Sequence, residues 1–496
     1  MTSDRIRVRL SDGTAEGVVA QGVQCFYSLP YAAPLTNGRR FRTPAPVEPW
    51  SGIRDATRPG PSAPQNPPPP SEIALGPFAA TSGVAGPDYL TLNVFAPVRA
   101  SAALPVMVFV HGGSFVAGSK DAPVTDGRAF ARDGVVCVVI NYRLGIEGFL
   151  PLDGVPTNLG LRDMIAALRW VARNAHQFGG DPHNVTMFGE SGGAYCVAAL
   201  MTSPLARGLF HRAICQSGHA YASRDEALLR QVSEQTARYL GVAPDRDGFL
   251  AVSVERMLEA QAWIMTPEAR IDLRDASGTD PSFGLTRFLP VHGDDVLPVP
   301  PLDALRQGAG RDVDLLISTN AEEANLFLVP GGLRDTIDRE TAVLFLERGL
   351  ARAREALTAY GFDDPGHKPG HVLARALTDL MFRSMARRTA EVHTGRSWVC
   401  EFDWRSPALG GEFGAAHAVE LPFVFDTLDA ARGAHGVLGM ARPQELADSV
   451  HGRWIEFARS GRPDWPEFDR ADRQVFSLTG GSAAAEPPMP ATRFLR

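Results

Sequence analysis

The pentapeptide Gly189-Glu190-Ser191-Gly192-Gly193 sets a single serine among small residues where a strand turns into a helix. Residues 185–188 are β-branched or apolar and predict the strand, and residues 194–201 have a helical composition without a breaker. A serine on so sharp a turn has a strained backbone that only small neighbours permit, and its hydroxyl projects above the N-terminus of the helix. We predict that Ser191 is a nucleophile; a plain glycine turn is the alternative.

A second glycine-rich segment, His-Gly-Gly-Ser-Phe at residues 111–115, directly follows the unbroken apolar run of residues 105–110. Such a run is typical of a strand buried on both faces of a parallel sheet. Backbone N–H groups at the end of this strand face the crevice where α/β proteins bind ligands, and the glycines leave room for a carbonyl oxygen. The segment is therefore a candidate for binding an oxyanion, with an ordinary turn after a strand as the alternative.

The motifs around these two segments, taken in order, resemble the type-B carboxylesterases, an α/β-hydrolase family that includes bacterial para-nitrobenzyl esterases and the cholinesterases. The resemblance is nearly continuous from about residue 5 to 218 and patchy beyond. Besides the two glycine-rich segments, it is carried by residues 26–32, 40–44, 50–57, 90–94, 141–150, 158–163 and 178–182.

The resemblance implies the α/β-hydrolase fold, a mainly parallel, twisted central sheet flanked by helices. The length of 496 residues alone favours three domains, but this family forms one large domain with long insertions, so we expect a single domain over residues 1–496. The weakly matching stretches of about 219–310 and 325–395 are expected to be cap-like excursions that shape the pocket. Residues 59–70, rich in proline, predict an irregular loop near the site entrance. Strands are expected near 105–110, 135–140, 185–188, 313–318 and 398–402, and a helix from 161.

The resemblance also implies a catalytic acid and base, in the chain order nucleophile, acid, base. Glu322 and Glu323 come directly after the strand expected at residues 313–320. The family pattern puts the acid at Glu323, where it would accept a hydrogen bond from the imidazole and stabilise its cation. The choice between the two glutamates stays open. Ser318 and Ala324 also stand where the family usually has glycine, which leaves the backbone conformation of the loop open. A surface pair of glutamates is the alternative.

For the base, residues 414–425 resemble the family's histidine-containing loop and follow the strand expected at 398–402. His417 is therefore the expected general base. No other histidine combines a preceding strand, a loop of small residues and a downstream Glu-Leu-Pro, and His111 is expected to support the oxyanion segment instead. The competitors by residue type alone are His111, His219, His292, His435 and His451.

By the same resemblance, the oxyanion donors are the backbone N–H groups of Gly113, Ser114 and Gly192. Ser114 stands where the family commonly has Gly or Ala, and Gly192 where Ala is common. Either residue still supplies a backbone N–H donor, but the geometry of the oxyanion hole is left open. Glu190 resembles a buried acid beside the nucleophile that would orient a water or tune the field at the site. Structural hydrogen bonding is the alternative role for Glu190.

Composition excludes some classes of protein. A net charge of −7 gives no basic surface for nucleic acid or an anionic membrane, and no apolar stretch approaches the roughly 18 residues of a membrane span. The first ten residues lack the apolar core of a signal peptide. Tyr89 stands where secreted relatives often have a cysteine, so we expect a cytoplasmic protein. Reduced thiols are expected at the five cysteines, which are Cys25, Cys137, Cys196, Cys215 and Cys400.

Together these residues predict a serine hydrolase that needs no cofactor or metal and cleaves small-molecule carboxylic esters through an acyl-enzyme intermediate. Two alternatives stay open. One is a carbamate or amide hydrolase that uses the same triad. The other is a non-catalytic binding or adhesion protein of the same fold, although such proteins usually lack members of the triad.

Overall fold

The structure is a computed structural model that describes residues 4–36, 38–99 and 103–495. The strands of its main sheet are β1 Asp4–Arg9, β2 Thr14–Ala20, β3 Val23–Pro30, β4 Ile53–Asp55, β5 Thr91–Pro97, β6 Leu104–Val110, β7 Val136–Ile140, β8 Gly180–Glu190, β9 Arg212–Gln216, β12 Asp314–Asn320, β13 Ser397–Phe402, β14 Gln474–Ser477 and β15 Ser482–Ala485. A separate two-stranded sheet consists of β10 Arg224–Asp225 and β11 Val291–His292.

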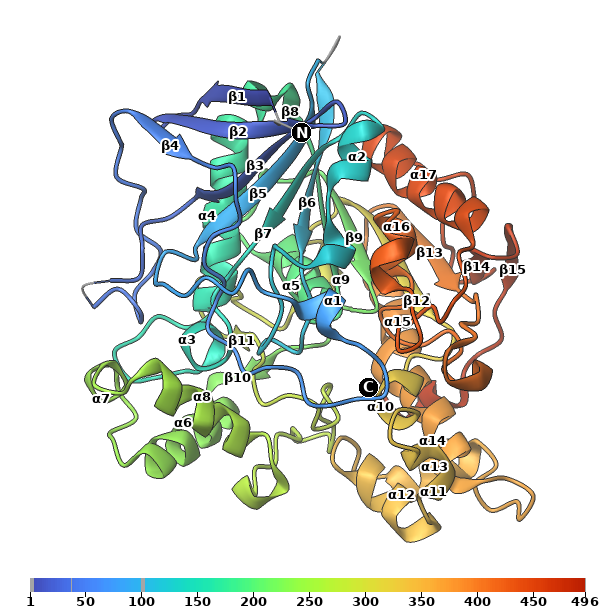
Figure 1. The fold of residues 1–496 in the computed structure, drawn as a ribbon. Helices are drawn as coiled ribbons and strands as arrows, with labels where there is room; N and C mark the ends of the chain where they lie inside the picture. Colours follow the sequence, from blue (N-terminus) through green and yellow to red (C-terminus); the bar gives the residue numbers. More distant parts are fainter. Residues whose placement is uncertain (1–3, 37, 100–102, 496) are drawn as a thin grey trace.

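The main sheet has the strand order β1-β2-β3-β5-β7-β6-β8-β9-β12-β13-β14-β15, with β4 beside β2 (Figure 1). From β7 to β14 neighbouring strands pair in parallel, whereas the pairs β1-β2, β2-β3, β3-β5, β5-β7 and β14-β15 are antiparallel. The expected α/β-hydrolase fold with a mainly parallel centre is thereby confirmed. All five expected strands are present, and β8 starts at Gly180, five residues before the predicted 185.

Helices cover both faces of this sheet. Their bounds are α1 Gly76–Ala79, α2 Arg128–Arg132, α3 Gly145–Phe149, α4 Leu159–Asn174, α5 Gly192–Thr202, α6 Glu226–Leu240, α7 Arg246–Leu250, α8 Val254–Ile264, α9 Pro301–Arg306, α10 Asn325–Leu328, α11 Leu333–Thr336, α12 Arg339–Glu347, α13 Ala353–Ala359, α14 Pro369–Thr378, α15 Ser384–Val392, α16 Leu421–Val424 and α17 Gln444–Ser460. A π-helical turn, η4 Asp379–Arg383, joins α14 to α15.

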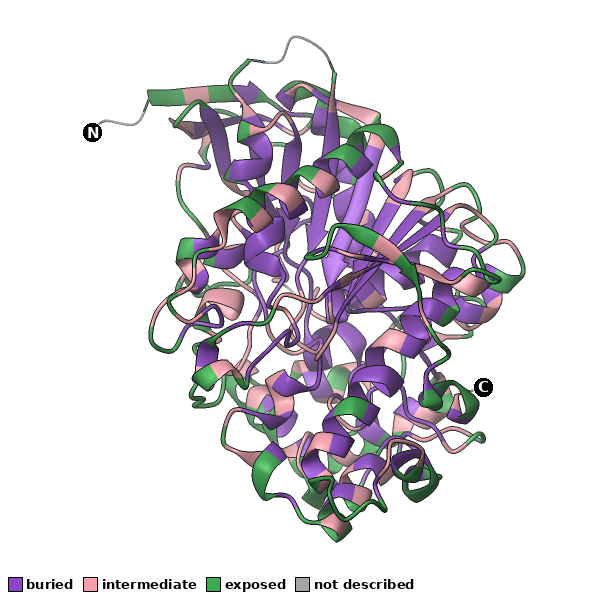
Figure 2. Ribbon diagram, turned by 90° about the vertical axis from the view of Figure 1, so that its right-hand side faces the viewer, coloured by how far each residue is buried: buried purple, intermediate pink, exposed green. Residues whose placement is uncertain are grey.

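Strand β6 illustrates why the sheet is buried on both sides. Val106, Val108 and Val110 belong to one hydrophobic cluster with residues of α4 and α5, while Met107 and Phe109 belong to a second cluster with residues of α17. Successive side chains of a strand point to opposite faces, so an unbroken apolar run is what a two-sided core requires. Figure 2 shows the resulting buried centre.

The parallel strands bring the candidate residues to one edge of the sheet. Strand β6 ends at Val110, directly before the first glycine-rich segment; β8 ends at Glu190, the residue before Ser191; and β12 ends at Asn320, two residues before Glu322. Carboxyl ends of parallel strands meet at the same edge, which is where open α/β sheets bind ligands. The fold therefore assembles the site from loops that are far apart in the sequence.

The second of the two expected excursions is largely helical, whereas the first combines helices with a long irregular segment. Residues 219–310 contain α6 to α9, and residues 325–395 contain α10 to α15 with their own hydrophobic cluster. In Figure 1, α6 to α8 and α11 to α14 form two separate groups below the sheet. That these excursions cap the pocket of a single domain stays a prediction.

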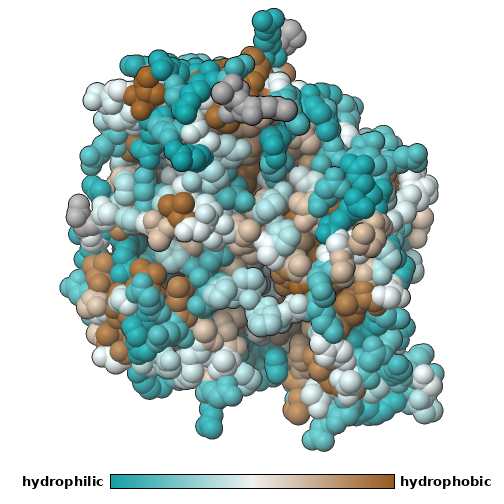
Figure 3. Space-filling model, in the orientation of Figure 1, coloured by the Kyte–Doolittle hydropathy of each residue, from teal (hydrophilic) through white to brown (hydrophobic). Residues whose placement is uncertain are grey.

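The protein surface is mostly hydrophilic on the face drawn in Figure 3, with apolar residues in small scattered groups. Within the described residues, no helix is both long and apolar enough to cross a lipid bilayer. The same residues contain no group of three or more His, Cys, Asp or Glu side chains arranged to hold a metal ion.

Candidate active site

Ser191 lies alone between β8 and α5, with φ 52° and ψ −124°. A non-glycine residue with positive φ is strained and persists only where its surroundings hold it. Here Gly189 and Gly193 allow the close packing that holds Ser191 in this conformation. A Cβ on Gly189 would lie 2.7 Å from the carbonyl carbon of Gly193, and a Cβ on Gly193 would overlap the carbonyl oxygen of Val110. The local geometry is that of the sharp strand-to-helix turn predicted from the sequence.

The candidate oxyanion donors lie close to this turn. Gly113 has φ 105° and Ser114 has φ 53°, so the loop turns sharply after β6. A Cβ on Gly192 would lie 3.5 Å from the backbone nitrogen of Ser114, which brings the two backbones together beside Ser191. Within the described part of the chain, the N–H groups of Gly113, Ser114 and Gly192 donate to no other group. Unpaired amides gathered at one place are suited to binding a developing oxyanion.

His417 and Glu323 form a buried pair. The Nδ1 atom of His417 is 2.6 Å from Oε2 of Glu323, whose side chain is fully buried. The other carboxylate oxygen, Oε1, accepts hydrogen bonds of 2.7 Å from the backbone N–H of Asn320 and from the Ser217 hydroxyl. These donors fix the carboxylate behind the imidazole, where it can select the ring tautomer.

Glu322 points away from the imidazole. Its carboxylate forms an ion pair with Arg405 and accepts a hydrogen bond of 2.9 Å from the amide of Ala415. The structure therefore brings Glu323, and not Glu322, to His417. Glu322 instead connects the loop after β12 to the segment before His417, through its bonds to Arg405 and Ala415.

Glu190 lies at the opposite side of the imidazole, with Oε1 3.1 Å from Nε2 of His417. Burial raises the pKa of Glu190 to about 8, against the attraction of the nearby imidazole. For His417, burial acts to lower the pKa, but the facing carboxylates of Glu190 and Glu323 outweigh it and raise the pKa to about 9. Within the described residues no hydrogen bond joins Nε2 to the Ser191 hydroxyl, an alignment that often tightens only with bound substrate.

An apolar cavity with a volume of about 30 Å³ adjoins Ser191, which is room for about one or two water molecules. Phe382 and Phe327 pack on the His417 ring, with centroids 4.8 and 5.6 Å away, and also line this cavity. Its other lining residues are Ser114, Phe115, Gly192, Tyr195, Ala222, Pro281, Ser282, Leu285, Thr286, Leu289 and Met381.

The competing histidines bond elsewhere. His111 stacks on Tyr142 with ring centroids 4.5 Å apart, and burial lowers its pKa to about 4, so that it is neutral beside the oxyanion loop. His219 contacts the carbonyl of Met381, and His451 that of Val424. The expectation that His111 supports the oxyanion loop stays a prediction, which its stacking on Tyr142 supports.

Several residues at the site were not anticipated from the sequence. Glu420, which is buried, accepts hydrogen bonds of 2.7 Å from Asn320 and 3.1 Å from Gln216, and burial raises the pKa of its carboxyl. Ser217 and Asn320 hold Glu323 as described above. The available signal was that Asn320 is the last residue of β12 and Ser217 directly follows β9, since the ends of neighbouring parallel strands reach the same sheet edge.

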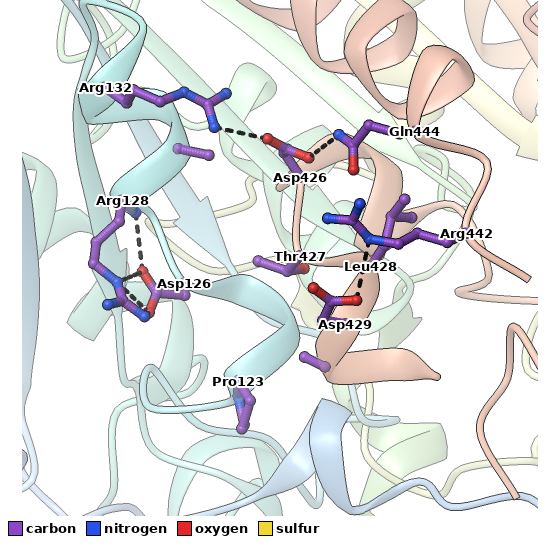
Figure 4. A pocket seen from close by; sticks show the side chains of 12 residues that line it. Pro123, Asp126, Arg128, Arg132, Asp426, Thr427, Leu428, Asp429, Arg442 and Gln444 are labelled. Carbon is purple, nitrogen blue, oxygen red and sulfur yellow. Dashed lines mark hydrogen bonds and ion pairs between the residues drawn. The ribbon is translucent and has the colours of Figure 1, made fainter. Parts of the chain in front are cut away.

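A second cavity, of about 390 Å³, lies between α2 and the segment that leads into α17 (Figure 4). Its charged side chains pair with one another: Arg132 with Asp426, Arg442 with Asp429, and Arg128 with Asp126. None of the candidate catalytic residues lines it. The cavity beside Ser191 is therefore the candidate active site.

The chain is similar to known proteins in sequence and in structure. The sequence profile of the carboxylesterase family matches residues 4–489. The para-nitrobenzyl esterase of Bacillus subtilis (strain 168) is 34% identical over 492 residues, covering 94% of this chain and 93% of that protein. The phenmedipham hydrolase of Pseudarthrobacter oxydans is 34% identical over 490 residues, covering 95% and 94%. A solved structure of a PNB esterase superposes with a TM-score of 0.81 at 32% identity and covers 99% of both chains.

Proposed function

Since the chain belongs to the carboxylesterase family, whose members are serine hydrolases of carboxylic esters, we propose that Ser191, His417 and Glu323 are its catalytic triad. The observation that carries this proposal is the buried contact of 2.6 Å between His417 Nδ1 and Glu323 Oε2, beside the strained turn that holds Ser191. Such a contact is the geometry that orients an imidazole for proton transfer.

In the proposed mechanism, the Ser191 hydroxyl attacks the ester carbonyl while Nε2 of His417 takes its proton. The N–H groups of Gly113, Ser114 and Gly192 stabilise the tetrahedral oxyanion. His417 then gives the proton to the departing alcohol. A water activated by the same imidazole releases the acid from the acyl-enzyme.

Glu190 is proposed to act on the charge of His417. Its carboxyl faces Nε2, the nitrogen that must receive the serine proton, at 3.1 Å. An ionised Glu190 would hold the imidazole in its cationic form and compete with Ser191, whereas a neutral Glu190 would leave Nε2 free to act as a base. Burial, which raises the pKa of Glu190 to about 8, weakens this hold on the imidazole, and the ionised fraction of the carboxyl is what raises the pKa of His417.

The substrates are small-molecule esters, and we propose short to medium acyl groups. The cavity beside Ser191 is small, and among the described residues no Lys, Arg or metal ligand lines it. The cavity therefore offers no charged anchor for a polyanionic substrate. The similarity to a para-nitrobenzyl esterase supports para-nitrobenzyl esters as first substrates to test. A carbamate or amide hydrolase remains the second candidate, because the same machinery performs those reactions.

Ser191→Ala tests the proposal directly. We expect at least about a thousandfold loss of kcat with normal folding, because the covalent route disappears. Mass spectrometry of the wild-type protein after treatment with an organophosphate should find one adduct, on the peptide that contains Ser191. An adduct elsewhere, with Ser191 unmodified, would overturn the assignment.

We also propose the cytoplasm as the compartment. The five cysteines are all buried and unpaired in the structure, and this lack of disulfides supports a reducing compartment. Fractionation of cells followed by immunodetection tests this proposal, and recovery of the protein outside the cytoplasm would refute it.

A further inference from the structure

The loop that carries the proposed oxyanion donors has a strained backbone. Gly113, Ser114, Phe115 and Gly118 all have positive φ, at 105°, 53°, 64° and 112°. Two of these residues bear side chains, for which this conformation is unfavourable in isolation. Such a backbone keeps its shape only where contacts from outside the loop hold it.

The tip of the loop is held by two such contacts. The carbonyl of Phe115 accepts a hydrogen bond of 2.7 Å from the Gly145 amide. The hydroxyl of Thr286 donates one of 2.9 Å to the carbonyl of Ser114, from a position 172 residues further along the chain. These bonds act on carbonyl groups and leave the Gly113 and Ser114 amides free to face substrate.

Gly118, near the end of the loop, is held by the side chain of Gln65. Its Oε1 accepts a hydrogen bond of 2.9 Å from the Gly118 amide, and its Nε2 donates one of 2.9 Å to the Gly118 carbonyl. Nε2 also donates to the carbonyl of Ala63 at 3.2 Å, which fixes the side chain. Within the described residues, Gly118 has no other hydrogen-bond partner.

Gly118 connects this anchor to the start of the loop. A Cβ on Gly118 would overlap Nδ1 of His111, so the two ends of the segment 111–118 touch. His111 itself is fixed by stacking on Tyr142 and by the bond of 2.9 Å from the Tyr142 hydroxyl to its carbonyl. The contact between Gly118 and His111 therefore closes a ring of chain that contains both Gly113 and Ser114, and Gln65 fixes the Gly118 end of that ring.

We propose that Gln65 is a positioning residue of the oxyanion hole, which sets the direction of the Gly113 and Ser114 amides through Gly118. The proposal rests on the function proposed above. Gln65 does not line the cavity beside Ser191, so it acts through the backbone and not by contact with substrate. Its place in the irregular proline-rich segment gives that segment a role in catalysis besides shaping the entrance.

Gln65→Met tests the proposal, because it keeps the length of the side chain and removes both bonds to Gly118. Asn66→Leu is the matched control: Asn66 is the next residue and donates to the Leu258 carbonyl at 3.0 Å, with no bond to the oxyanion loop. The measurements are kcat/KM for para-nitrophenyl acetate and the inhibition constant of an aryl trifluoromethyl ketone, which forms a tetrahedral oxyanion with the serine.

For Gln65→Met we expect kcat/KM to fall by about 10- to 100-fold, and the ketone to bind more weakly by a similar factor, since both depend on oxyanion stabilisation. Gln65→Glu keeps the acceptor for the Gly118 amide and loses the donor, so its values should lie between. Asn66→Leu should change neither quantity more than about twofold. Stoichiometric labelling by an organophosphate counts the folded enzyme in each preparation.

An unchanged ketone affinity in Gln65→Met would overturn the proposal, even if activity falls through misfolding. An equal loss in Asn66→Leu would also overturn it, because the effect would then belong to the whole segment. Failure of the proposed function has a different signature, since the wild-type protein itself would then neither label at Ser191 nor bind the ketone.

Discussion

His417 faces a carboxylate at each of its ring nitrogens, and the two carboxylates differ in how they are held. Glu323, at Nδ1, accepts bonds from Asn320 and Ser217 in addition. Glu190, at Nε2, has an Oε1 atom with no other partner among the described residues. A fixed acceptor suits the role of orienting the ring, and a carboxyl without other donors suits a group that changes its charge.

Glu323→Gln should lower kcat by about 10³- to 10⁴-fold, because the amide can present a donor to Nδ1 and favour the wrong tautomer. Glu322→Gln is the matched control, since that side chain pairs with Arg405 and should cost less than about tenfold. Steady-state kinetics on a para-nitrophenyl ester separates the two. A large loss of kcat in Glu322→Gln together with normal activity in Glu323→Gln would mean that Glu322 is the catalytic acid.

Glu190→Gln should move the acid limb of the profile of kcat/KM against pH to lower pH. The wild-type carboxylate raises the pKa of His417, so its removal lets the imidazole lose its proton at lower pH and become a base there. The profile is measured on the wild-type protein, on Glu190→Gln and on Glu322→Gln as a control. An acid limb that stays in place or moves to higher pH would contradict the role proposed for Glu190.

At the scale of single elements, a feature could be predicted when neighbouring residues in the sequence determine it. The turn at Ser191 follows from five consecutive residues between a strand and a helix, and the structure has that turn. The oxyanion loop could also be located, because its glycines follow an apolar strand. Its anchors could not, since Gln65 and Thr286 are distant in sequence and carry no local signal. The antiparallel strands β1 to β3 were likewise not anticipated from the pattern of residues.

The neighbouring glycines of the turn allow an element-scale prediction. Gly193→Ala should destabilise the protein by more than about 2 kcal/mol and abolish activity, because its Cβ would overlap the backbone carbonyl of Val110. Gly192→Ala should fold and keep activity within about tenfold, since its Cβ would lie 3.3 Å from the Phe115 nitrogen and needs only a small adjustment. Thermal unfolding and kcat/KM are measured together. Equal stability of the two variants would show that the turn is less tightly packed than described.

For the molecule as a whole, the sequence is least informative about which residues line the pocket. Leu285 and Thr286 belong to the first excursion, while Phe327, Met381 and Phe382 belong to the second. Family motifs are sparse in these stretches, and which of their side chains meet at Ser191 depends on how the irregular segment that carries Leu285 and Thr286 packs against α10 and η4. The fold and the proposed triad could therefore be predicted from motifs, but the lining of the pocket required the structure.

The size of this pocket leads to a prediction about substrate. A cavity of about 30 Å³ must open to admit an acyl chain, and each further methylene has to displace apolar side chains that already pack together. Initial rates on para-nitrophenyl esters should therefore be highest for short to medium acyl groups and fall for long ones, without activation by an emulsion. Met381→Ala should shift the optimum to longer chains, because Met381 is a flexible, buried part of the wall. Leu344→Ala, at an exposed position of α12 away from the pocket, is the control and should leave the profile unchanged.

The matched amide should react slower by orders of magnitude, because its leaving group is much poorer. A preference for long-chain emulsions, or equal rates on ester and amide, would favour a lipase or an amidase instead.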